Sequence, residues 1–439
     1  MKYYLAIDLG ATSGRHVVGC FDNGKITLDE VYRFKTGMDE SKDGLVWDIP
    51  RLNKEIIKGI KKAFDKYPHI ISLSIDTWGV DYVLMNGDKE ISPYYAYRNK
   101  RNEEAAKKMH AIVPFDELYR LTGIQFASFN TIYQLFDDKE KGRLDKATDY
   151  LMLPSYFSYK LTGIKTHEYT NETTGALLNA NTQKYLYDVF DKIGLPRKLF
   201  GEISEPGTKA GKLLPEIAEQ VGGNCDVVLC ASHDTASAFE SVDIDDESII
   251  LSSGTWSLLG IKTKKPIISE KSMNANYTNE GGVNYIRFLK NIMGMYIANR
   301  VIEENNLTQD VVNNEVIISK YDGTFDVNDS RLTAPKNMSQ ATMELLKDNP
   351  PERVFDLLRS IYQSMAKAYL KAINELENIV GHSFSKIIVI GGGAKNEFLN
   401  DLVKKYTKKQ VIPVIGEATC LGNIKMQIKA EETKNEKRS

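Results

Sequence analysis

Short apolar runs separated by polar turns open this chain. Tyr3–Ile7 has the length and β-former content of a buried strand, and Arg15–Phe21 and Lys25–Phe34 continue the pattern. The last two runs are joined at Asp22-Asn23-Gly24, a tight-turn signal typical of a hairpin. The pattern therefore predicts three consecutive antiparallel strands at the start of the chain.

The apolar spacing then changes from that of strands to that of a helix. Asp48 suits the N-cap, Pro50 falls in the first turn, and Pro68 ends the pattern. One apolar stripe follows this helix: Leu52, Ile56, Ile60, Ala63, Phe64 and Tyr67. A further strand is predicted at Ile70–Ile75, and the strand Val227–Cys230 is predicted after a mixed middle third.

The opening pattern returns in the second half of the chain. Glu247–Leu251 predicts a strand, Ser252-Ser253-Gly254-Thr255 a turn, and Trp256–Ile261 a return strand. A strand, a Gly/Thr/Ser turn and another strand thus begin both halves. We interpret this as a degenerate duplication with a boundary near residues 236–246.

The remaining elements of the second half alternate between helix and strand. The predicted elements are a long helix from Val354 to Gly381, a strand at Lys386–Ile390, a helix at Asn396–Tyr406, a strand at Val411–Ile415, a helix at Glu417–Ile428 and a frayed charged tail at Lys429–Ser439.

Length and composition bound the number of domains. A chain of 439 residues with 42% apolar residues is long for one core, so two domains are expected. We place one domain over residues 1–240 and the other over residues 241–439. Lys plus Arg (57) nearly balances Asp plus Glu (59), a balance that indicates neither nucleic acid nor an anionic membrane as a partner.

Cysteine usage and the N-terminus indicate the compartment. The four cysteines, Cys20, Cys225, Cys230 and Cys420, show no zinc spacing and are interpreted as reduced structural thiols. No apolar run approaches membrane-spanning length, and Asp8 interrupts the N-terminus too early for a signal peptide. A cytoplasmic protein is therefore expected. Separately, we expect a monomer or a small homo-oligomer.

The first turn is a candidate anion site. Gly10-Ala11-Thr12-Ser13-Gly14 can turn several backbone N–H groups to one side, and its two hydroxyls add donors. Arg15 adds a fork that suits phosphate oxygens, and Asp8 at the entrance suits a magnesium ion, held directly or through water. The alternative is a hairpin turn without a ligand, and from this stretch alone the two interpretations have equal weight.

Asp234 is the candidate for chemistry. It follows a predicted strand, and Thr235 to Phe239 after it has a helical pattern. A plain N-cap is the alternative, but the two roles are compatible, because phosphoryl transfer requires its base chiefly to orient a hydroxyl. His233 beside it is interpreted as a structural residue or a ligand contact.

Trp78-Gly79-Val80-Asp81 is a candidate sugar subsite. An indole face suits the C–H face of a sugar, Gly79 permits a close backbone approach, and Asp76 or Asp81 can accept from hydroxyls. A core tryptophan is the alternative, although two acids beside a buried ring need partners.

Familiar nucleotide-binding motifs are absent from the sequence. There is no G-x-x-x-x-G-K-[ST] segment, which excludes a P-loop protein. Gly391-Gly392-Gly393 follows a strand, but Asn396 stands where a dinucleotide fingerprint needs a small residue, so a Rossmann dehydrogenase is disfavoured. The three glycines can still admit an adenine ring or a phosphate against bare backbone, or they only turn the chain into a helix.

Twelve segments, in order along the chain, resemble one family. They are AIDLGATSGR (6–15), SIDTWGVDYVL (74–84), AYRN (96–99), GIQFASFNTIYQL (123–135), LPSYFSYKLTG (153–163), EYTNETT (168–174), ASHDTASA (231–238), LSSGTWSL (251–258), TNEGG (278–282), LKNIMGMY (289–296), VIGGGAKNEFLN (389–400) and EATCLGN (417–423). Together they resemble the FGGY carbohydrate kinases of the actin, sugar-kinase and heat-shock-ATPase superfamily.

The resemblance implies a fold and a site. It implies an α/β protein of two ribonuclease-H-like (actin-like ATPase) domains, each a mixed sheet flanked by helices, with an interdomain cleft. The N-terminal domain would bind the sugar and carry the phosphate loop, and the C-terminal domain would bind the nucleotide. The implied sugar contacts are Gly79, His233, Asp234 and Thr235, beside Trp78 and Asp81. The implied nucleotide contacts are Ala11, Thr12, Ser13, Gly14, Arg15, Thr255, Asn291 and Gly392, together with Asn299, which stands where the family has a glutamine.

The resemblance also implies a reaction, with Asp234 as the base and Asp8 serving Mg²⁺. That reaction is ATP-dependent phosphorylation of L-rhamnulose to L-rhamnulose 1-phosphate. The same chemistry on another ketose, such as L-fuculose or L-ribulose, is an alternative. Two further alternatives are an actin-like ATPase that acts on a protein partner and a sugar-binding protein with weakened catalysis.

Overall fold

The computed structural model describes residues 1–436 as two compact units. Unit 1 comprises residues 1–242, 262–288 and the chain from 419 onward, and unit 2 comprises residues 243–261 and 289–418. Strands β15 (Trp256–Thr263) and β17 (Ile286–Met293) run across the boundary in sequence. Within residues 1–436 no helix is both long and apolar enough to cross a membrane.

Unit 1 contains a six-stranded mixed sheet of order β12-β13-β6-β1-β2-β3. Its strands are β1 (Lys2–Leu9), β2 (Ser13–Asp22), β3 (Lys25–Lys35), β6 (Ile70–Thr77), β12 (Lys209–Lys212) and β13 (Asp226–Val228). The first three strands pair antiparallel in sequence order, whereas β6 pairs parallel with β1 and β13 pairs parallel with β6. The predicted antiparallel start of the chain is therefore confirmed.

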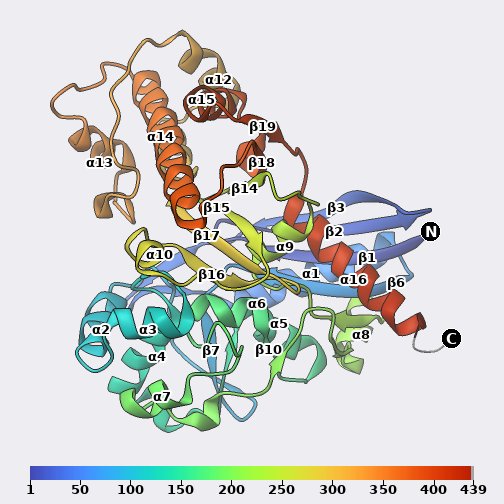
Figure 1. The fold of residues 1–439 in the computed structure, drawn as a ribbon. Helices are drawn as coiled ribbons and strands as arrows, with labels where there is room; N and C mark the ends of the chain where they lie inside the picture. The colour runs from blue at the N-terminus through green and yellow to red at the C-terminus, as the bar shows by residue number, and fades with distance from the viewer. Residues whose placement is uncertain (437–439) are drawn as a thin grey trace. The chain divides into compact units, whose positions relative to one another are not determined.

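Two helices cover opposite faces of this sheet because successive side chains of a strand point to opposite sides. Leu5 and Ile7 pack in one cluster with the apolar stripe of α1 (Ile49–Lys66). Tyr4 and Ala6 pack in another with Ile424 on α16 (Ala418–Glu436), which crosses the strands in Figure 1. Asp48 caps α1 by accepting a hydrogen bond from the Arg51 N–H at 3.0 Å, as predicted.

The other elements of unit 1 form small sheets and a helical layer. The strands of the small sheets are β4 (Met38–Ser41), β5 (Gly44–Trp47), β7 (Tyr82–Asn86), β8 (Lys89–Ile91), β9 (Asp149–Met152), β10 (His167–Glu168) and β11 (Ile203–Ser204). Strand β16 (Thr278–Gly281) also belongs to unit 1 but is an edge strand of the second six-stranded sheet. The helices are α2 (Arg101–His110), α3 (Phe115–Thr122), α4 (Thr131–Glu140), α5 (Leu153–Thr162), α6 (Tyr169–Glu172), α7 (Tyr187–Ile193), α8 (Pro215–Val221), α9 (Asp234–Glu240) and α10 (Glu270–Asn274).

The second sheet has the order β16-β17-β15-β14-β18-β19 and repeats the plan of the first. Strand β14 (Ser248–Ser253) pairs antiparallel with β15 and parallel with β18 (Lys386–Ile390), and β18 pairs parallel with β19 (Gln410–Pro413). An opening hairpin followed by parallel strands thus occurs in both sheets, as the predicted duplication requires. Two mixed sheets with flanking helices confirm the predicted fold class.

The helices of unit 2 pack around one long helix, α14 (Val354–Val380). It ends at Gly381, whose φ of 69° is left-handed and suits glycine, as the sequence predicted. The Tyr369 hydroxyl on α14 lies 2.6 Å from the Ser257 hydroxyl on β15. The other helices are α11 (Tyr296–Glu304), α12 (Gln309–Ile318), α13 (Met338–Leu345) and α15 (Glu397–Thr407).

Several predicted elements differ in extent from the structure, among them β13, β19 and α16. Strand β13 ends at Val228 rather than Cys230, because the Leu229 N–H and C=O bond the loop at Gly207–Thr208. Strand β19 ends at Pro413, so residues 414 and 415 lie outside it. Helix α16 continues to Glu436, where the sequence indicated a frayed tail, and residues 437–439 of that prediction lie outside the described residues.

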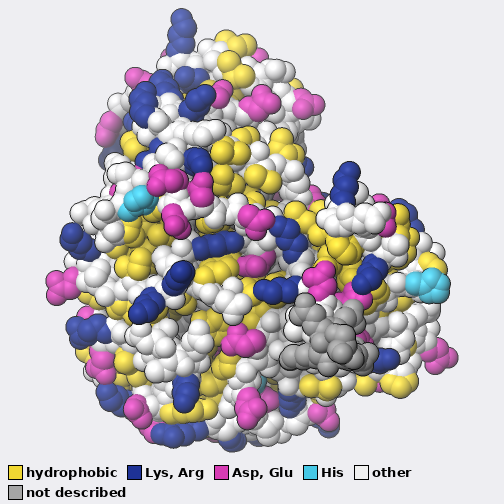
Figure 2. All heavy atoms as spheres, turned by 45° about the vertical axis from the view of Figure 1, so that its right-hand side comes forward, with side chains coloured by type: hydrophobic (Ala, Val, Ile, Leu, Met, Phe, Trp, Pro, Cys, Tyr) yellow, Lys and Arg dark blue, Asp and Glu magenta, His cyan; other side chains and the backbone are white. Residues whose placement is uncertain are grey.

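Charged side chains are mixed over the face of the molecule that Figure 2 shows, where Lys and Arg lie among Asp and Glu. This is the pattern that the near balance of 57 basic and 59 acidic residues produces.

Candidate active site

Two carboxylates lie side by side at the ends of adjacent strands in unit 1. Asp8 on β1 pairs in parallel register with Asp76 on β6, and both side chains are buried. Arg15 Nε lies 2.9 Å from Asp8 Oδ2. Burial raises the pKa of Asp8, whereas the Arg15 charge lowers it and the Asp234 carboxylate raises it. Burial, then the charges of Asp8 and Asp234, raise the pKa of Asp76 well above its ordinary value. The three acidic groups therefore share one neighbourhood.

Asp234 is the first residue of α9, and its segment is fixed to the end of β6. The Thr77 N–H donates to the Ser232 carbonyl at 2.9 Å, and Thr77 forms a parallel bridge with His233. The N–H and O–H of Thr235 lie 2.6 and 3.1 Å from Asp234 Oδ1. Within residues 1–436 no hydrogen bond reaches Asp234 Oδ2, and the side chain is 30% exposed. One carboxylate oxygen is held and the other is available.

The predicted phosphate loop is the turn between β1 and β2. The Gly10 N–H donates to the Ser13 carbonyl at 2.9 Å, and Thr12 at the tip is exposed. A side chain at Gly14 would clash with the ring of Phe34, so close packing requires glycine there. The structure thus contains the hairpin turn that both interpretations of this stretch require, and phosphate binding by Ala11 to Arg15 stays a prediction.

The Trp78 loop is held together by Asp81. Its carboxylate is 0% exposed and accepts from the indole N–H groups of Trp47 (2.6 Å) and Trp78 (2.9 Å). The Tyr97 N–H (3.2 Å) and the Gln134 side chain (3.3 Å) also donate to it. Burial, which outweighs these bonds, raises the pKa of Asp81 to about 6. The Asp81 oxygens are therefore engaged inside the protein.

Gly79 and Trp78 differ in their surroundings. The Trp78 ring is 6% exposed and lies 4.2 Å from the ring of Trp47, centroid to centroid. A side chain at Gly79 would come within 2.8 Å of the Thr174 hydroxyl, and that hydroxyl accepts from the Val80 N–H. The loop backbone at Gly79 is thus held between the tryptophan pair and the segment around Thr174.

Two of the four nucleotide contacts predicted in unit 2 lie on the turns that follow the neighbouring strands β18 and β14. Gly392 begins the turn after β18, and an added Cβ at this position would meet nothing within 4 Å. A side chain at the neighbouring Gly393 would clash with Ser253 on β14. The turn that follows β14 carries Thr255, whose carbonyl accepts from the Gly294 N–H at 3.2 Å.

The remaining two predicted contacts of unit 2 lie on β17 and α11. Asn291 is half-buried on β17, three residues before Gly294. Asn299 is exposed on α11, and its N–H donates to the Met295 carbonyl at 2.8 Å. The Met295 N–H in turn donates to the Gly254 carbonyl at 2.9 Å, so the start of α11 is tied to the same turn.

Sequence reasoning assigned no role to Glu168, a fully buried carboxylate behind the Asp234 segment. It accepts from the Ser232 N–H at 3.1 Å and from the Ser232 hydroxyl. It also caps α6, accepting from the N–H groups of Thr170 (2.9 Å) and Asn171 (3.1 Å). Glu168 therefore ties α6 to the residue that precedes His233. The segment EYTNETT was noted only as part of a resemblance, because a lone glutamate carries no positional signal.

His167, beside Glu168, gives a pH-dependent stability prediction. Burial lowers its pKa, but the carboxylates of Asp149 (3.4 Å) and Glu172 (3.1 Å), which accept from the two ring nitrogens, together outweigh burial and raise the pKa to about 9. In the unfolded chain the pKa of a histidine is about 6.5. The protonated His167 side chain therefore stabilises the folded state fully below about pH 6.5, and this stabilisation is lost as the pH rises through about 9.

We expect the wild type to have a larger free energy of unfolding than His167→Gln, and this difference to fall by about 3 kcal/mol between about pH 6 and about pH 10. Urea unfolding at both pH values measures this difference. His382→Gln, at an exposed histidine, is the control and should show no comparable change. A difference in free energy of unfolding that stays constant or grows with pH would contradict the prediction.

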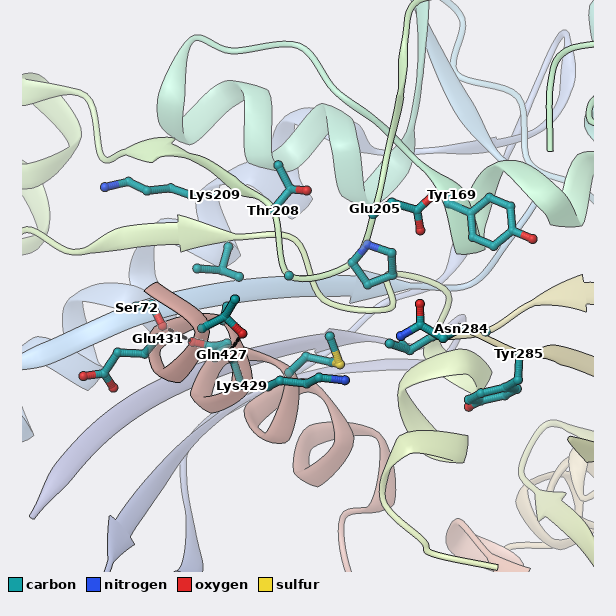
Figure 3. Close-up of a pocket in the computed structure, with 18 of the residues that line it drawn as sticks. Ser72, Tyr169, Glu205, Thr208, Lys209, Asn284, Tyr285, Gln427, Lys429 and Glu431 are labelled. Atoms are coloured by element: carbon teal, nitrogen blue, oxygen red, sulfur yellow. Dashed lines mark hydrogen bonds between the residues drawn. The ribbon is translucent and has the colours of Figure 1, made fainter. Parts of the chain in front are cut away.

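A pocket in unit 1 lies apart from the predicted site residues (Figure 3). Its volume is about 1150 Å³, and none of the predicted catalytic, sugar or nucleotide residues lines it. The labelled lining residues include Tyr169, Glu205, Asn284 and Lys429. Cavity volume alone therefore does not identify the chemistry of this chain.

The acidic neighbourhood of Asp8 fits a magnesium ion. Asp76 Oδ1 is buried and accepts no hydrogen bond within residues 1–436. No three His, Cys, Asp or Glu side chains form a complete metal cage in the described part of the chain. Mg²⁺ commonly uses only one or two carboxylates and completes its shell with water and substrate phosphates.

Solved structures share this fold. A ligand-bound xylulose kinase from Lactobacillus acidophilus aligns with a TM-score of 0.81 at 14% identity, covering 99% of this chain and 90% of that one. A Plasmodium falciparum glycerol kinase with ADP aligns with a TM-score of 0.74 at 12% identity, covering 99% and 90%. These alignments show that the chain shares the overall α/β fold of these two proteins.

Sequence comparison identifies the family. The model of the N-terminal domain of the FGGY family of carbohydrate kinases matches residues 3–239, and that of the C-terminal domain matches residues 249–431. Rhamnulokinase from Oceanobacillus iheyensis is 39% identical over 97% of this chain and 93% of its own. Rhamnulokinase from Bacillus subtilis is 36% identical over 98% and 89%. The chain belongs to the FGGY family of carbohydrate kinases, and it is a phosphotransferase that uses ATP.

Proposed function

We propose that this protein transfers the γ-phosphoryl group of ATP to the O1 hydroxyl of L-rhamnulose, forming L-rhamnulose 1-phosphate and ADP in L-rhamnose catabolism. Relatives named rhamnulokinase, 35–40% identical over nearly the whole chain, support the sugar. The observation that carries the chemistry is the Asp234 carboxylate, with Oδ1 held by Thr235 and Oδ2 available.

Asp234 acts as the base in this proposal. Oδ2 accepts the proton of the O1 hydroxyl while that oxygen forms a bond to the γ-phosphorus and the bond to the β–γ bridging oxygen breaks. The base chiefly orients the hydroxyl, because phosphoryl transfer depends mainly on positioning and electrostatic stabilisation. Gly79, His233 and Thr235 contact the sugar. Trp78 and Asp81, whose polar atoms bond each other, hold the Gly79 backbone.

The nucleotide contacts are proposed from both halves of the chain. The turn from Ala11 to Arg15, including Thr12, Ser13 and Gly14, binds phosphate oxygens through backbone N–H groups and hydroxyls. Thr255, Asn291, Asn299 and Gly392 contact the nucleotide. In this proposal residues 1–240 bind the sugar and carry the phosphate loop, and residues 241–439 bind the nucleotide.

Mg²⁺ is the proposed metal, with Asp8 as its protein ligand, directly or through water, and Asp76 beside it. When bound, the ion supplies positive charge that neutralises phosphate oxygens. The four free cysteines, three of them buried, support a reducing cytoplasmic location, and a monomer or small homo-oligomer is proposed.

ADP release measured with a panel of ketoses tests this function. We expect the highest kcat/KM with L-rhamnulose, lower values with L-fuculose and L-ribulose, and no turnover when EDTA removes Mg²⁺. Preference for another ketose would transfer the proposal to that sugar. ADP release that does not depend on any sugar would instead favour an ATPase acting on a protein, and sugar binding without ADP release would favour a binding protein.

Substitutions at two neighbouring glycines, Gly392 and Gly393, distinguish an effect on nucleotide binding from an effect on folding. Gly392→Ala adds a methyl group where the structure has open space, so we expect an unchanged melting temperature and a KM for ATP raised about fivefold, or ~1 kcal/mol. Gly393→Ala instead clashes with Ser253 and is expected to destabilise the protein by about 1–3 kcal/mol. ATP titrations and thermal unfolding of both variants measure this contrast. An unchanged KM in Gly392→Ala would remove this position from the site.

A further inference from the structure

A buried ion pair lies directly behind His233. Arg287 on β17 is 0% exposed, and its Nη2 lies 3.2 Å from Glu280 Oε2 on β16. The same Nη2 lies 3.1 Å from His233 Nδ1, and Glu280 Oε2 lies 3.3 Å from that nitrogen. Burial raises the pKa of Glu280, but the Arg287 charge and the neighbouring His233 ring together outweigh burial and lower it, so the carboxylate is ionised.

Donor chemistry selects one tautomer of the His233 ring. A guanidinium has five N–H donors, accepts nothing and stays charged in proteins. The hydrogen bond between Arg287 and His233 therefore requires a lone pair on Nδ1. A neutral imidazole that accepts at Nδ1 carries its proton on Nε2. The opposite tautomer would point Nδ1–H at Glu280 but would leave an Arg287 N–H facing a ring N–H.

The other ring nitrogen faces the proposed base. His233 Nε2 lies 3.4 Å from Asp234 Oδ1, the oxygen that also faces the N–H and O–H of Thr235. An N–H at this nitrogen adds a third donor to Oδ1 and leaves Oδ2 as the more basic atom. The hydrogens that face Oδ1 also fix the plane of the carboxylate, because turning it would break the two hydrogen bonds from Thr235.

We propose that Arg287 is a positioning residue: it holds His233 in the Nε2–H tautomer, so that Asp234 presents Oδ2 to the substrate hydroxyl. This inference rests on the proposed role of Asp234 as the base. Arg287 is itself fixed, because its Nε donates to the Gly281 carbonyl at 2.8 Å and its guanidinium lies 6.0 Å from the ring centre of Phe239. A lysine ammonium has three N–H donors on a single nitrogen and lacks this planar fork of separate nitrogens.

The tautomer is measured directly by ¹⁵N NMR of protein labelled at histidine. The chain has six histidines, and the His233 signals are assigned by their absence from His233→Gln. We expect an unprotonated Nδ1 and a protonated Nε2 in the wild type without substrates. A protonated Nδ1 in the wild type would overturn the proposal.

Two variants test the consequence for catalysis. Arg287→Met alone would leave Glu280 as an unpaired buried charge, so the double variant Arg287→Met/Glu280→Gln removes both charges together. We expect the double variant to lose the single tautomer and to lower kcat by up to about 10²-fold, with the KM for the sugar nearly unchanged. Arg287→Lys should restore part of kcat. Arg120→Met, at an exposed arginine, is the control.

The outcomes separate this inference from the proposed function. If Asp234→Ala is inactive but the double variant keeps its kcat, Arg287 does not position the base. If the tautomer is as expected but Asp234→Ala keeps full activity, the proposed role of Asp234 fails and the assignment of the His233 tautomer stands. A double variant that fails to fold is recognised by its thermal unfolding, and Arg287→Lys then decides through kcat and the ring nitrogen signals.

Discussion

Asp234→Ala is expected to lower kcat by about 10²–10⁴-fold, because the variant has no group to orient the substrate hydroxyl and accept its proton. The KM for ATP should change little, since Asp234 is proposed to contact only the sugar. Coupled measurement of ADP release with L-rhamnulose, together with thermal unfolding, gives both quantities. The melting temperature should remain close to that of the wild type, because the Asp234 side chain is 30% exposed and its hydrogen bonds come from the next residue.

The control for this variant is Asp188→Ala, at an exposed aspartate on α7 of the same unit. It removes the same charge and the same atoms away from the proposed site, so kcat should be unchanged. An Asp234→Ala enzyme with full activity would reject Asp234 as the base. A large loss in the Asp188 control would mean that net charge, rather than position, determines the rate.

Asp81→Ala is expected to be the most destabilising of the single substitutions considered for this chain. Removing the carboxylate leaves the buried indole N–H groups of Trp47 and Trp78 without an acceptor. Each unsatisfied buried donor costs about 1–3 kcal/mol, so the loss of the acceptor for two of them should lower the free energy of unfolding by roughly 2–6 kcal/mol. Urea or thermal unfolding measures this loss, and Asp188→Ala again serves as the exposed control.

The activity of Asp81→Ala tests whether the loop of Trp78 and Gly79 contributes to sugar binding. At a temperature where Asp81→Ala remains folded, we expect a raised KM for the sugar, because the Gly79 backbone is no longer held by the Trp78 to Asp81 bond. The KM for ATP should be less affected. A variant as stable as the wild type would show that the four hydrogen bonds to Asp81 contribute little to folding.

Local structure could be predicted wherever neighbouring residues determine it. The apolar spacing and the Asp48 cap located α1, and Lys386–Ile390 was predicted with the bounds that β18 has in the structure. The extent of α16 was underestimated because its last turns are rich in charge. In the structure the helix is held against the sheet, because Ile424 and Ile428 pack in one cluster with Tyr4 and Ala6.

The site was predictable in part, because some residues follow one another in sequence. Asp234 beside His233 and Thr235 could be singled out from a strand, an acid and a helix in succession. The sequence could not predict that Asp76 and Asp8 lie close together. Their proximity depends on the parallel register of β1 and β6, which are more than sixty residues apart in sequence. Arg287 carried only a weak signal, a single charge among the apolar residues Ile286 and Phe288.

The amino-acid sequence alone determined the class of this protein: short-range patterns specify strands, turns and helices, and the order of its motifs indicates the FGGY kinase family. Tertiary structure alone decided which polar atoms are available. Asp81 and Asp234 each follow a strand and look equally available in the sequence. In the described part of the chain, however, four donors surround Asp81, whereas one oxygen of Asp234 accepts no hydrogen bond. The physical reason is that burial and hydrogen bonding depend on residues distant in the chain, which only folding brings together.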